Sequence, residues 1–515
     1  MSYLTNYSRN NSQRRLGMRE KYESLSVTVL REVAKARGLK GLSGLKKSEL
    51  VELMLKEDEK VAKEESAKKA AQEESQEKTV KVKKKKDKKI EKEKTDKSDR
   101  TEKREERHGE KREEHYEERK EKSPNKVVTK DGIEIENPEL DSGISAKGIL
   151  EVMGDGFGFI RSENYLPGEN DVYVSPAQIR RFGLKTGDVI CGNTKIKTQQ
   201  EKFSALLYIK SINGCHPSVI LKRPNFEDLT PIFPNERIRL ETEKGGVAMR
   251  IMDLVSPIGK GQRGMIVSPP KAGKTTLLKQ VARSVTRNNP DMHLIILLID
   301  ERPEEVTDIK EAIRGKNVEV IYSTFDELPE HHKRVSEMVI ERGRRLVEQG
   351  KDVMILLDSI TRLARAYNLI VPPSGRTLSG GIDPAALHMP KRFFGAARNM
   401  REGGSITILA TALVETGSRM DDVVYEEFKG TGNMEIILDR KLSERRVFPA
   451  VDIVKSGTRR EDLLLNQEEK EAVEIMRRAI NGMKADEAVE SILNMFVRTQ
   501  NNHEFCQMVK RTKLI

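Results

Sequence analysis

Hydrophobic and polar positions follow two regular patterns in the last two thirds of this chain of 515 residues. Between Gly148 and Gly214, short runs of alternating apolar and polar residues are separated by turn residues, a pattern that predicts β-strands. Five short strands within about seventy residues are typical of a small β-barrel such as an OB-fold. The expected strands are Gly148–Met153, Gly158–Ser162, Asp171–Val174, Asp188–Lys197 and Phe203–Ile212.

Beyond Arg237, continuous apolar runs alternate with stretches of helical periodicity. This alternation predicts right-handed βαβ units and an α/β fold whose parallel sheet is covered by helices on both faces. The expected core strands are Gly264–Val267, His293–Asp300, Val318–Ser323, Asp352–Asp358, Ser405–Ala412 and Asn433–Leu438. The expected helices are Thr275–Arg287, Glu304–Arg314, His331–Glu348, Pro390–Asn399 and a helical end over Asn466–Lys510.

The first part of the chain has a different character. Residues 1–23 are polar and without period, which predicts a mobile tail, whereas residues 24–56 carry apolar side chains at helical spacing and predict a small helical module. Residues 57–143 are dominated by charged side chains and bury too little apolar area to offset the entropy of ordering, so we expect a disordered insertion. The domains expected after it are an OB-fold over 144–216, a connector over 217–236 and the α/β domain over 237–515.

Charge and composition narrow the class of protein. Lys and Arg number 94 and Asp and Glu 82, a formal net charge of +12 that favours a polyanionic partner without choosing between nucleic acid and a membrane surface. No apolar run is long enough for a membrane helix, and the first residues lack a signal segment. The three cysteines are scattered, without metal spacing. These features predict a cytoplasmic protein without a membrane partner.

A phosphate-binding loop follows the apolar run Gly264–Val267 and precedes a helical stretch. A nucleoside triphosphate needs converging backbone N–H groups, a Lys that reaches the β- and γ-phosphates and a hydroxyl for Mg²⁺. Gly273, Lys274 and Thr275 have the required spacing, although Ser268 replaces the usual first glycine. The expected nucleotide-binding residues are Ser268, Pro269, Pro270, Lys271, Ala272, Gly273, Lys274, Thr275 and Thr276.

Two carboxylates stand at the ends of predicted parallel strands. Asp358 ends the strand Val353–Asp358, where phosphates dock, and is expected to hold Mg²⁺ together with Thr275. Glu301 ends a second strand and could orient and polarise the attacking water. The alternative for Glu301 is a charged turn that caps a helix starting near Pro303, and spacing alone leaves both possibilities open.

Arginine-rich segments over 440–446 and 456–460 follow the last predicted strand. An arginine supplied by a neighbouring subunit can stabilise the charge that develops during phosphoryl transfer. The alternative is that these arginines are ordinary solvated surface.

Aromatic residues gather in the predicted barrel. Phe157 and Phe159 share one face of a strand and, with Tyr173, could form a platform on which bases stack. Arg161, Arg180 and Arg181 could neutralise phosphates. The alternative is that the rings belong to the barrel core, but the glycines beside them leave the rings poorly covered, which favours single-strand binding.

Several long stretches resemble the Rho family of bacterial transcription termination factors, ring-shaped RNA-dependent ATPases of the RecA-like class. The stretches are Asp300-Glu-Arg-Pro-Glu-Glu-Val306, Asp358-Ser-Ile-Thr-Arg-Leu-Ala-Arg-Ala-Tyr367 and Arg392-Phe-Phe-Gly-Ala-Ala-Arg398. The resemblance extends from Gly148 to Lys510 and includes the helical module. It implies a RecA-like ATPase domain, with ATP and Mg²⁺ as cofactors.

The resemblance also implies roles for residues of the nucleotide site. Lys274 and Thr275 would contact the phosphates and Mg²⁺, Lys271 would assist, Asp358 would support the metal and Glu301 would activate water. Arg302 would lie beside Glu301, Arg459 would be the finger that reaches into a neighbour's site, Arg446 a second phosphate-facing arginine and Phe448 the stacking partner of adenine.

RNA contacts are implied at two places. In the barrel the matching residues are Phe157, Phe159, Arg161, Asp171, Tyr173, Glu201 and Phe203, of which Phe203 stands where the family commonly has Tyr. In the ring pore they are Arg376, Leu378, Ser379, Gly380 and Gly381 in one loop, and Gly417, Arg419 and Lys429 in a second region.

The function expected from these features is that of a transcription termination factor. The chain would form a homohexamer, bind nascent single-stranded RNA, translocate along it by ATP hydrolysis and release it from the RNA polymerase elongation complex. Two alternatives remain open: a RecA-like rotary ATPase subunit without RNA coupling, and an RNA-binding chaperone whose nucleotide site is vestigial.

Overall fold

The computed structural model describes residues 22, 27, 34, 46–54, 126–128, 134–136, 138–198, 201–243, 246–481 and 485–511. The chain divides into two compact units, Met1–Glu121 and Lys122–Ile515. In the first unit residues 47–54 are helical, with Leu50, Val51 and Met54 buried. Nearly all of the expected tail, and most of the expected module and insertion, lie outside the described residues.

The second unit opens with two short antiparallel strands, β1 (Lys126–Val128) and β2 (Glu134–Glu136), followed by the 3-10 helix η1 (Pro138–Leu140). Both strands lie within residues 57–143, where the sequence predicts no ordered element.

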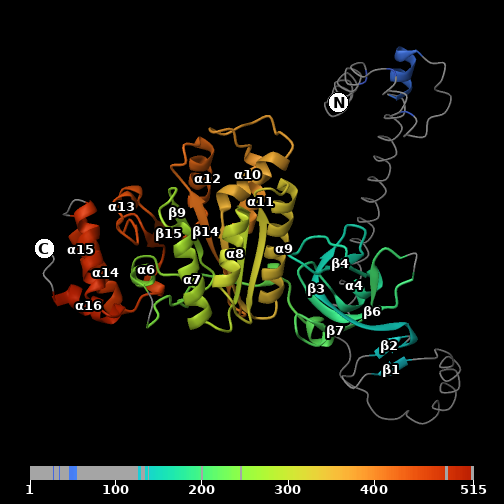
Figure 1. Cartoon of the computed structure of the whole chain (residues 1–515), viewed down its shortest axis with the longest axis horizontal. Helices are drawn as coiled ribbons and strands as arrows, with labels where there is room; N and C mark the ends of the chain where they lie inside the picture. The colour runs from blue at the N-terminus through green and yellow to red at the C-terminus, as the bar shows by residue number, and fades with distance from the viewer. Residues whose placement is uncertain are drawn as a thin grey trace, which may run out of the picture. The chain divides into compact units, whose positions relative to one another are not determined.

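A closed five-stranded barrel follows, with strand order β3-β4-β5-β7-β6 (Figure 1). Its interior is filled by branched aliphatic residues such as Leu150, Ile160, Val174, Ile190 and Ile212. Each strand overlaps one of the five expected from alternation, so the barrel prediction is confirmed. The elements are β3 (Asp141–Val152), β4 (Gly158–Arg161), β5 (Val172–Val174), α4 (Pro176–Phe182), β6 (Val189–Lys195) and β7 (Ser204–Ile212).

A connector made of α5 (Pro217–Ile220), η2 (Phe226–Asp228) and β8 (Pro231–Ile232) leads to a nine-stranded sheet. The main path of the sheet is β11-β10-β12-β14-β9-β15-β16, and it is parallel from β11 to β15. Strands β13 and β8 extend it antiparallel from β14. The strands are β9 (Arg263–Ser268), β10 (His293–Glu301), β11 (Val318–Thr324), β12 (Asp352–Asp358), β13 (Arg398–Met400), β14 (Ser405–Leu413), β15 (Met434–Ile437) and β16 (Gly457–Thr458).

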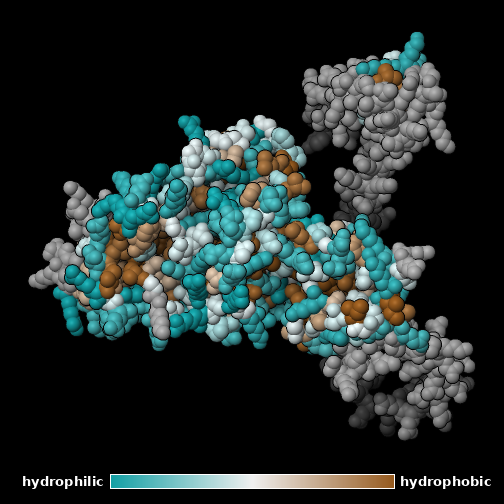
Figure 2. Space-filling view, in the orientation of Figure 1, coloured by the Kyte–Doolittle hydropathy of each residue, from teal (hydrophilic) through white to brown (hydrophobic). Residues whose placement is uncertain are grey.

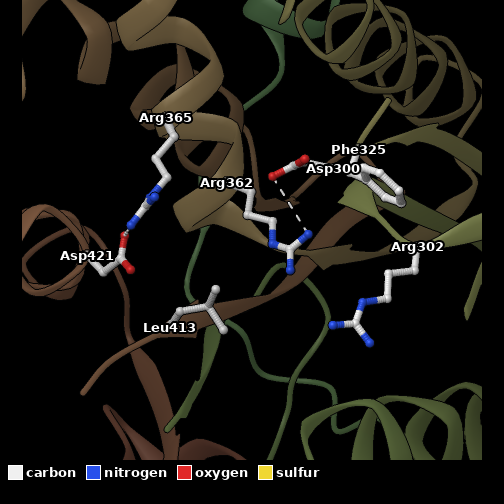
Figure 3. A pocket seen from close by; sticks show the side chains of 7 residues that line it. All are labelled: Asp300, Arg302, Phe325, Arg362, Arg365, Leu413 and Asp421. Carbon is white, nitrogen blue, oxygen red and sulfur yellow. Dashed lines mark hydrogen bonds and ion pairs between the residues drawn. The ribbon is translucent and has the colours of Figure 1, made fainter. Parts of the chain in front are cut away.

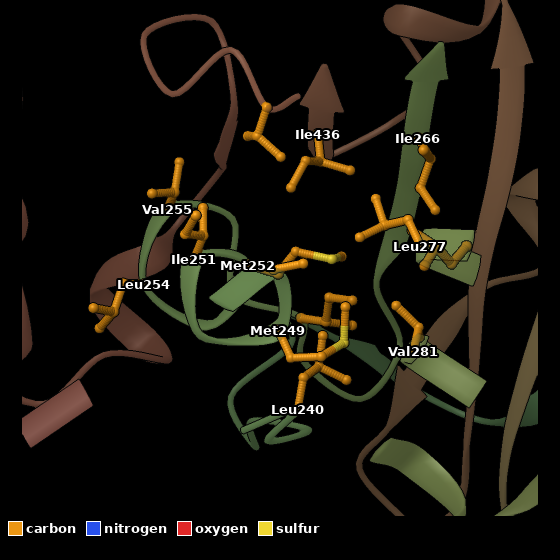
Figure 4. Close-up of a cluster of buried hydrophobic side chains, with 14 of the residues drawn as sticks. Leu240, Met249, Ile251, Met252, Leu254, Val255, Ile266, Leu277, Val281 and Ile436 are labelled. Carbon is orange, nitrogen blue, oxygen red and sulfur yellow. The ribbon is translucent and has the colours of Figure 1, made fainter. Parts of the chain in front are cut away.

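Helices cover both faces of this sheet, as the apolar runs predict. In β10, Leu294, Ile296 and Leu298 join one hydrophobic cluster, whereas Ile295 and Leu297 join the other, because alternate residues of a strand point to opposite faces. Figure 4 shows part of the first cluster, where α6 and α7 pack against β9 and β15. That face is covered by α6 (Val247–Val255), α7 (Lys274–Asn288) and α8 (Pro303–Ala312), and the opposite face by α9 (Pro329–Val347), α10 (Ile360–Ile370), α11 (Pro384–Gly395) and α12 (Arg419–Lys429).

The C-terminal part is helical, as expected. Its elements are α13 (Arg440–Glu444), η3 (Glu461–Leu463), α14 (Gln467–Asn481), α15 (Ala485–Val497) and α16 (Asn502–Arg511). Hydrophilic residues occupy most of the face shown in Figure 2. Within the described part of the chain, no helix has an apolar stretch of the length that crossing a bilayer requires.

One expected helix is wrong in its bounds. The sequence predicts Pro390–Asn399, but α11 begins six residues earlier at Pro384, and Arg398–Met400 is strand β13. Asp383 caps α11 by accepting a hydrogen bond from the N–H of Ala385, and a proline in the first turn needs no donor. Pro390 lies inside the helix.

Candidate functional sites

The segment between β9 and α7 has the geometry of a phosphate-binding loop. Gly273 has a φ of 93° and Lys271 a φ of 64°, left-handed conformations that bend the backbone back on itself. Helix α7 has no acidic residue in its first turn, so its N-terminal N–H groups and positive dipole end face no carboxylate of its own. Residues 268–271 and 273–276 line a cavity of 340 Å³ together with Leu413.

Ser268, which replaces the usual first glycine, is accommodated without conflict. Its side chain is 1% exposed, and its hydroxyl donates to the carbonyl oxygen of Pro269 at 2.8 Å. The buried hydroxyl of Ser268 therefore has its hydrogen-bond partner within the loop.

Lys274 joins the two candidate carboxylates. Its Nζ lies 3.1 Å from Oε1 of Glu301 and 2.5 Å from Oδ1 of Asp358. The same Asp358 oxygen accepts a hydrogen bond from Oγ1 of Thr411 at 2.7 Å. Three residues that are far apart in sequence meet because β9, β10 and β12 end at the same edge of the parallel sheet.

The helix-capping alternative for Glu301 is wrong. Helix α8 begins at Pro303 with Arg302 as its N-cap and has no side-chain capping bond, while Glu304 and Glu305 occupy its first turn. The Glu301 carboxylate points instead to Lys274, and its side chain is 4% exposed.

The net effect of burial and neighbouring charges is to raise the pKa values of both Glu301 and Lys274. Burial raises the pKa of Glu301, the nearby charge of Asp358 raises it further, and Lys274 and Arg362 oppose the rise only in part. Burial would lower the pKa of Lys274, but Asp358 and Glu301 outweigh it and raise that pKa above its ordinary value. The lysine therefore stays charged while the glutamate holds its proton more tightly than an exposed carboxyl does.

A second cavity of 400 Å³ is lined by Asp300, which precedes Glu301, and by Leu413, which also lines the cavity of the loop (Figure 3). Arg362 lies 3.7 Å from Asp300 and 3.8 Å from Glu301, so its charge is held at the mouth of the nucleotide site. Arg302, the residue expected beside Glu301, lines the same cavity with an exposed side chain. Its remaining lining residues are Phe325, Arg365, Leu413 and Asp421.

Sequence reasoning assigned no role to Arg362 or Thr411. Arg362 lies near the start of α10, shortly after Asp358, and its place in the stretch Asp358–Tyr367 that resembles the family was the available signal. Thr411 lies on β14, and only the pairing of β12 with β14 brings it to Asp358.

Phe448 lies on the other side of the loop. Its ring would come within 3.9 Å of a Cβ placed on Gly273, and it lines a cavity of 520 Å³ with Lys271 and Val247. The ring is attached to a residue that is 51% exposed, which leaves a face open for stacking.

Arg459, the candidate finger, and Arg446, the candidate second phosphate-facing arginine, do not line the cavities around the loop within one chain. Arg446 is exposed beyond the end of α13 with a φ of 62°. Arg459 is exposed and lines a separate cavity of 660 Å³ with Lys429, Arg460 and Arg477.

The two candidate pore segments meet at one glycine. Gly380 has a φ of 87°, and a Cβ there would lie 2.7 Å from the backbone nitrogen of Met420 and 2.8 Å from the carbonyl carbon of Arg419. Only glycine permits this approach. The loop that carries Arg376, Leu378, Ser379, Gly380 and Gly381 thus packs on the start of α12, next to Gly417 and Arg419.

Lys429 does not belong to that cluster. It ends α12, and a helix of this length separates its ends by about 15 Å. Lys429 instead lines the cavity of Arg459, with its Nζ 5.4 Å from the ring centroid of Tyr425.

The aromatic residues of the barrel form a cluster outside its core. Phe159 lies 5.7 Å from Phe157, 6.0 Å from Tyr173 and 5.1 Å from Phe203, measured between ring centroids. All four residues are half-buried, and none belongs to the hydrophobic cluster that fills the barrel. The alternative that these rings are barrel core is therefore wrong.

Polar residues adjoin this ring cluster. Arg161 stacks over Phe159 with 4.8 Å between its guanidinium carbon and the ring centroid. It donates to Glu151 at 2.7 Å and is also bonded to Asp171, whose other oxygen, Oδ1, is buried without a partner among the described residues. A buried acceptor of this kind is available for a donor such as the amino group of a base.

The remaining barrel candidates are less closely engaged. Glu201 accepts a hydrogen bond from the N–H of Thr198 at 2.9 Å, and that bond lowers its pKa. Arg180 and Arg181 are exposed on α4, and Arg181 lies 5.4 Å from the ring centroid of Phe182.

Two family models match the chain. Residues 146–218 match the Rho termination factor RNA-binding domain, and residues 248–458 match the nucleotide-binding domain of the ATP synthase alpha/beta family. The first match covers the barrel, and the second covers the sheet with its phosphate-binding loop. The expected fold class is therefore confirmed.

Curated relatives match most of the chain. It is 56% identical over 373 residues to transcription termination factor Rho of Pseudomonas aeruginosa, which covers 72% of this chain and 88% of that protein. The corresponding protein of Bacillus subtilis is 54% identical over 376 residues, 73% of this chain and 87% of that protein. That of Aquifex aeolicus is 54% identical over 366 residues, 70% of this chain and 84% of that protein. The resemblance seen in the motifs is thus confirmed, and the chain belongs to the family of transcription termination factor Rho.

Proposed function

We propose that this chain terminates transcription as a homohexameric, RNA-dependent ATPase that moves along nascent RNA and releases it from RNA polymerase. One observation carries the proposal: a nucleotide site, in which Lys274 bridges Glu301 and Asp358, shares a chain with an uncovered aromatic face on a barrel. The relatives named transcription termination factor Rho and the match to the Rho RNA-binding domain support the same function.

The catalytic steps follow from the contacts of Lys274. In the absence of nucleotide, this lysine neutralises Glu301 and Asp358. The β- and γ-phosphates of ATP would compete for it and free the carboxylates. Glu301 would then accept a proton from the water whose oxygen attacks the γ-phosphorus, while the bond to the ADP oxygen breaks.

The donors present fit a magnesium ion. Thr275 lines the cavity of the loop, and Lys274 and Thr411 both engage the same oxygen of Asp358, Oδ1. Hydroxyl and carboxylate oxygens are the hard donors that Mg²⁺ takes alongside phosphate. When bound, the ion would offset the developing charge on the phosphate oxygens.

The position of Arg459 argues for an oligomeric site. Hydrolysis of this type is accelerated by an arginine that contacts the transferred phosphate, and Arg459 is exposed in a different cavity of its own chain. In a ring built from head-to-tail contacts, one surface of each protomer faces a different surface of the next. Arg459 of one protomer would thus complete the pocket of its neighbour.

RNA would bind in two places. The rings of the barrel face would stack on bases, and pyrimidines would suit the unpaired acceptor of Asp171 when they carry an amino group. The loop around Gly380 and the start of α12 would grip RNA in the pore, where Arg376 and Arg419 supply charge.

ATP hydrolysis measured with RNA, with DNA and without polynucleotide tests the proposal. We expect RNA to stimulate hydrolysis and Lys274→Ala to lose about 10³-fold in rate, because the phosphates lose their cation. The matched control is Lys279→Ala, since Lys279 lies on the same helix but pairs with Asp308 at the surface. Equal rates with and without RNA would favour the rotary ATPase alternative, and no hydrolysis in any condition would favour the chaperone.

A further inference from the structure

The barrel is anchored to the ATPase domain near the C-terminal end of α9. Glu348, which directly follows α9, is 0% exposed and lies 3.1 Å from Lys185 of the barrel and 3.3 Å from Arg223 of the connector. Gly187 has a φ of 93°, and a Cβ there would lie 2.5 Å from the carbonyl carbon of Glu341. Buried charges and backbone contact make this end a fixed attachment.

The N-terminal end of α9 meets the barrel differently. Nη2 of Arg334 lies 2.6 Å from Oε2 of Glu151, and the same oxygen accepts a hydrogen bond from Nε of Arg161 at 2.7 Å. The Arg334 side chain is 33% exposed, whereas the Glu348 side chain at the other end is 0% exposed. Contact here depends on the charged hydrogen bond of a partly exposed side chain, not on a buried charge.

A second contact reaches the sheet from the aromatic face. In the loop between β4 and β5, the Asn164 amide donates to the carbonyl of Tyr322 at 2.6 Å and accepts from its N–H at 3.0 Å. The hydroxyl of Tyr165 donates to Glu319 at 2.5 Å. Both partners lie on β11, the edge strand of the sheet, so the loop that joins two strands of the aromatic face closes that edge.

The segment from β11 to α9 touches the backbone of the catalytic glutamate. The N–H of Phe325, directly after β11, donates to the carbonyl oxygen of Glu301 at 3.2 Å. His332 of α9 is buried and bonded through Nδ1 to the hydroxyl of Ser323 at 2.7 Å. The start of α9 and the end of β11 are thus tied together next to Glu301.

We propose that Arg334 is a positioning residue that couples RNA on the aromatic face to the placement of Glu301. The inference rests on the proposed RNA-dependent ATPase. A base that engages Arg161 draws this guanidinium away from Glu151. The Glu151 carboxylate then interacts more strongly with Arg334, its other partner. Because the far end of α9 is fixed, the change is taken up at its N-terminal end, which His332 ties to Ser323 and thus to the segment whose Phe325 N–H is bonded to the carbonyl oxygen of Glu301. RNA binding shifts the equilibrium between two placements of Glu301, and the rate of ATP hydrolysis changes with that equilibrium.

The experiment compares full-length Arg334→Gln, Arg334→Lys and the neighbouring control Lys333→Gln. Each is tested for the ratio of ATP hydrolysis with saturating single-stranded RNA to hydrolysis without it, and for binding of a labelled oligocytidine. We expect Arg334→Gln to lower the stimulation ratio about fivefold or more, a typical coupling, with oligocytidine affinity changed less than the ratio. Arg334→Lys should restore most of the ratio, because the charge is kept, and Lys333→Gln should match the wild type.

A double-mutant cycle with Glu151→Gln separates coupling from general damage. If the Glu151–Arg334 contact carries the signal, Arg334→Gln has no further effect once Glu151 is neutralised. An unchanged ratio in Arg334→Gln, or an equal loss in both backgrounds, overturns the inference while the RNA-dependent ATPase stands. A wild-type protein that RNA fails to stimulate overturns the proposed function and the inference with it.

Discussion

The nucleotide pocket and the aromatic face of the barrel each hold a cation between two carboxylates, but they differ in what surrounds that cation. In the pocket, Lys274 is held between two carboxylates that are 4% and 1% exposed, so charge is neutralised and buried. On the barrel, Arg161 is likewise bonded to Glu151 and Asp171, but four half-buried rings lie beside it and beside Lys202. We propose that the RNA face is complete in one chain, whereas the nucleotide pocket is completed by Arg459 of another protomer, because Arg459 lines a separate cavity of its own chain.

The largest expected effect concerns Arg459. Arg459→Ala should lower RNA-stimulated hydrolysis by about 10³-fold and leave ATP binding within a few-fold, because the arginine acts on transition-state charge. Steady-state hydrolysis and nucleotide binding are measured on the same preparation. Arg460→Ala is the matched control, since Arg460 pairs with Asp462 at the surface. Normal turnover in Arg459→Ala would remove this residue from the pocket.

A change on the aromatic face of the barrel should have a smaller effect, and the effect should be on RNA binding. Phe159→Ala removes the ring that touches Phe157, Tyr173 and Phe203, and should weaken oligocytidine binding by about 1–3 kcal/mol. Hydrolysis without RNA should not change. The control is Phe233→Ala in the connector, where the side chain is 64% exposed. If both variants bind RNA like the wild type, the rings are not the binding face.

The smallest expected effect is a shift in the pH profile. A base must be deprotonated, and burial together with Asp358 raises the pKa of Glu301. Activity should therefore decline on acidification at a higher pH than the ordinary glutamate value of about 4.3, by a few-fold in mildly acidic buffer. The ratio kcat/KM for ATP at saturating RNA, which reports the pKa values of the free enzyme, is measured against pH. A profile that stays flat down to the ordinary carboxyl range would show that Glu301 is not the group that titrates.

Strand order explains which parts of the pocket could be predicted from sequence. Lys274, Glu301 and Asp358 each follow an apolar run, and the ends of parallel strands meet at one edge, so their meeting was predictable. Thr411 and Arg362 could not be placed in the same way, because their contacts depend on the pairing of β14 and on the direction of α10.

Helix boundaries and side-chain faces account for the other features that could not be predicted from the sequence. The sequence placed Lys429 and Arg419 in one RNA-contacting region because α12 between them was not predicted, and the helix separates them. The period of a strand shows that Phe157 and Phe159 share a face but not which face fills the barrel. The contacts of Glu151 with Arg334 join residues 183 positions apart and had no signal in the sequence.

The central claim is that each active pocket is shared by two protomers, and a mixing experiment tests it most directly. Lys274→Ala and Arg459→Ala are each inactive by this account, but in mixed rings roughly one interface in four joins an intact Lys274 to an intact Arg459. ATP hydrolysis is measured with RNA after the two proteins are combined and allowed to exchange subunits. The account predicts activity above that of either variant alone, whereas activity equal to the average of the two would contradict it.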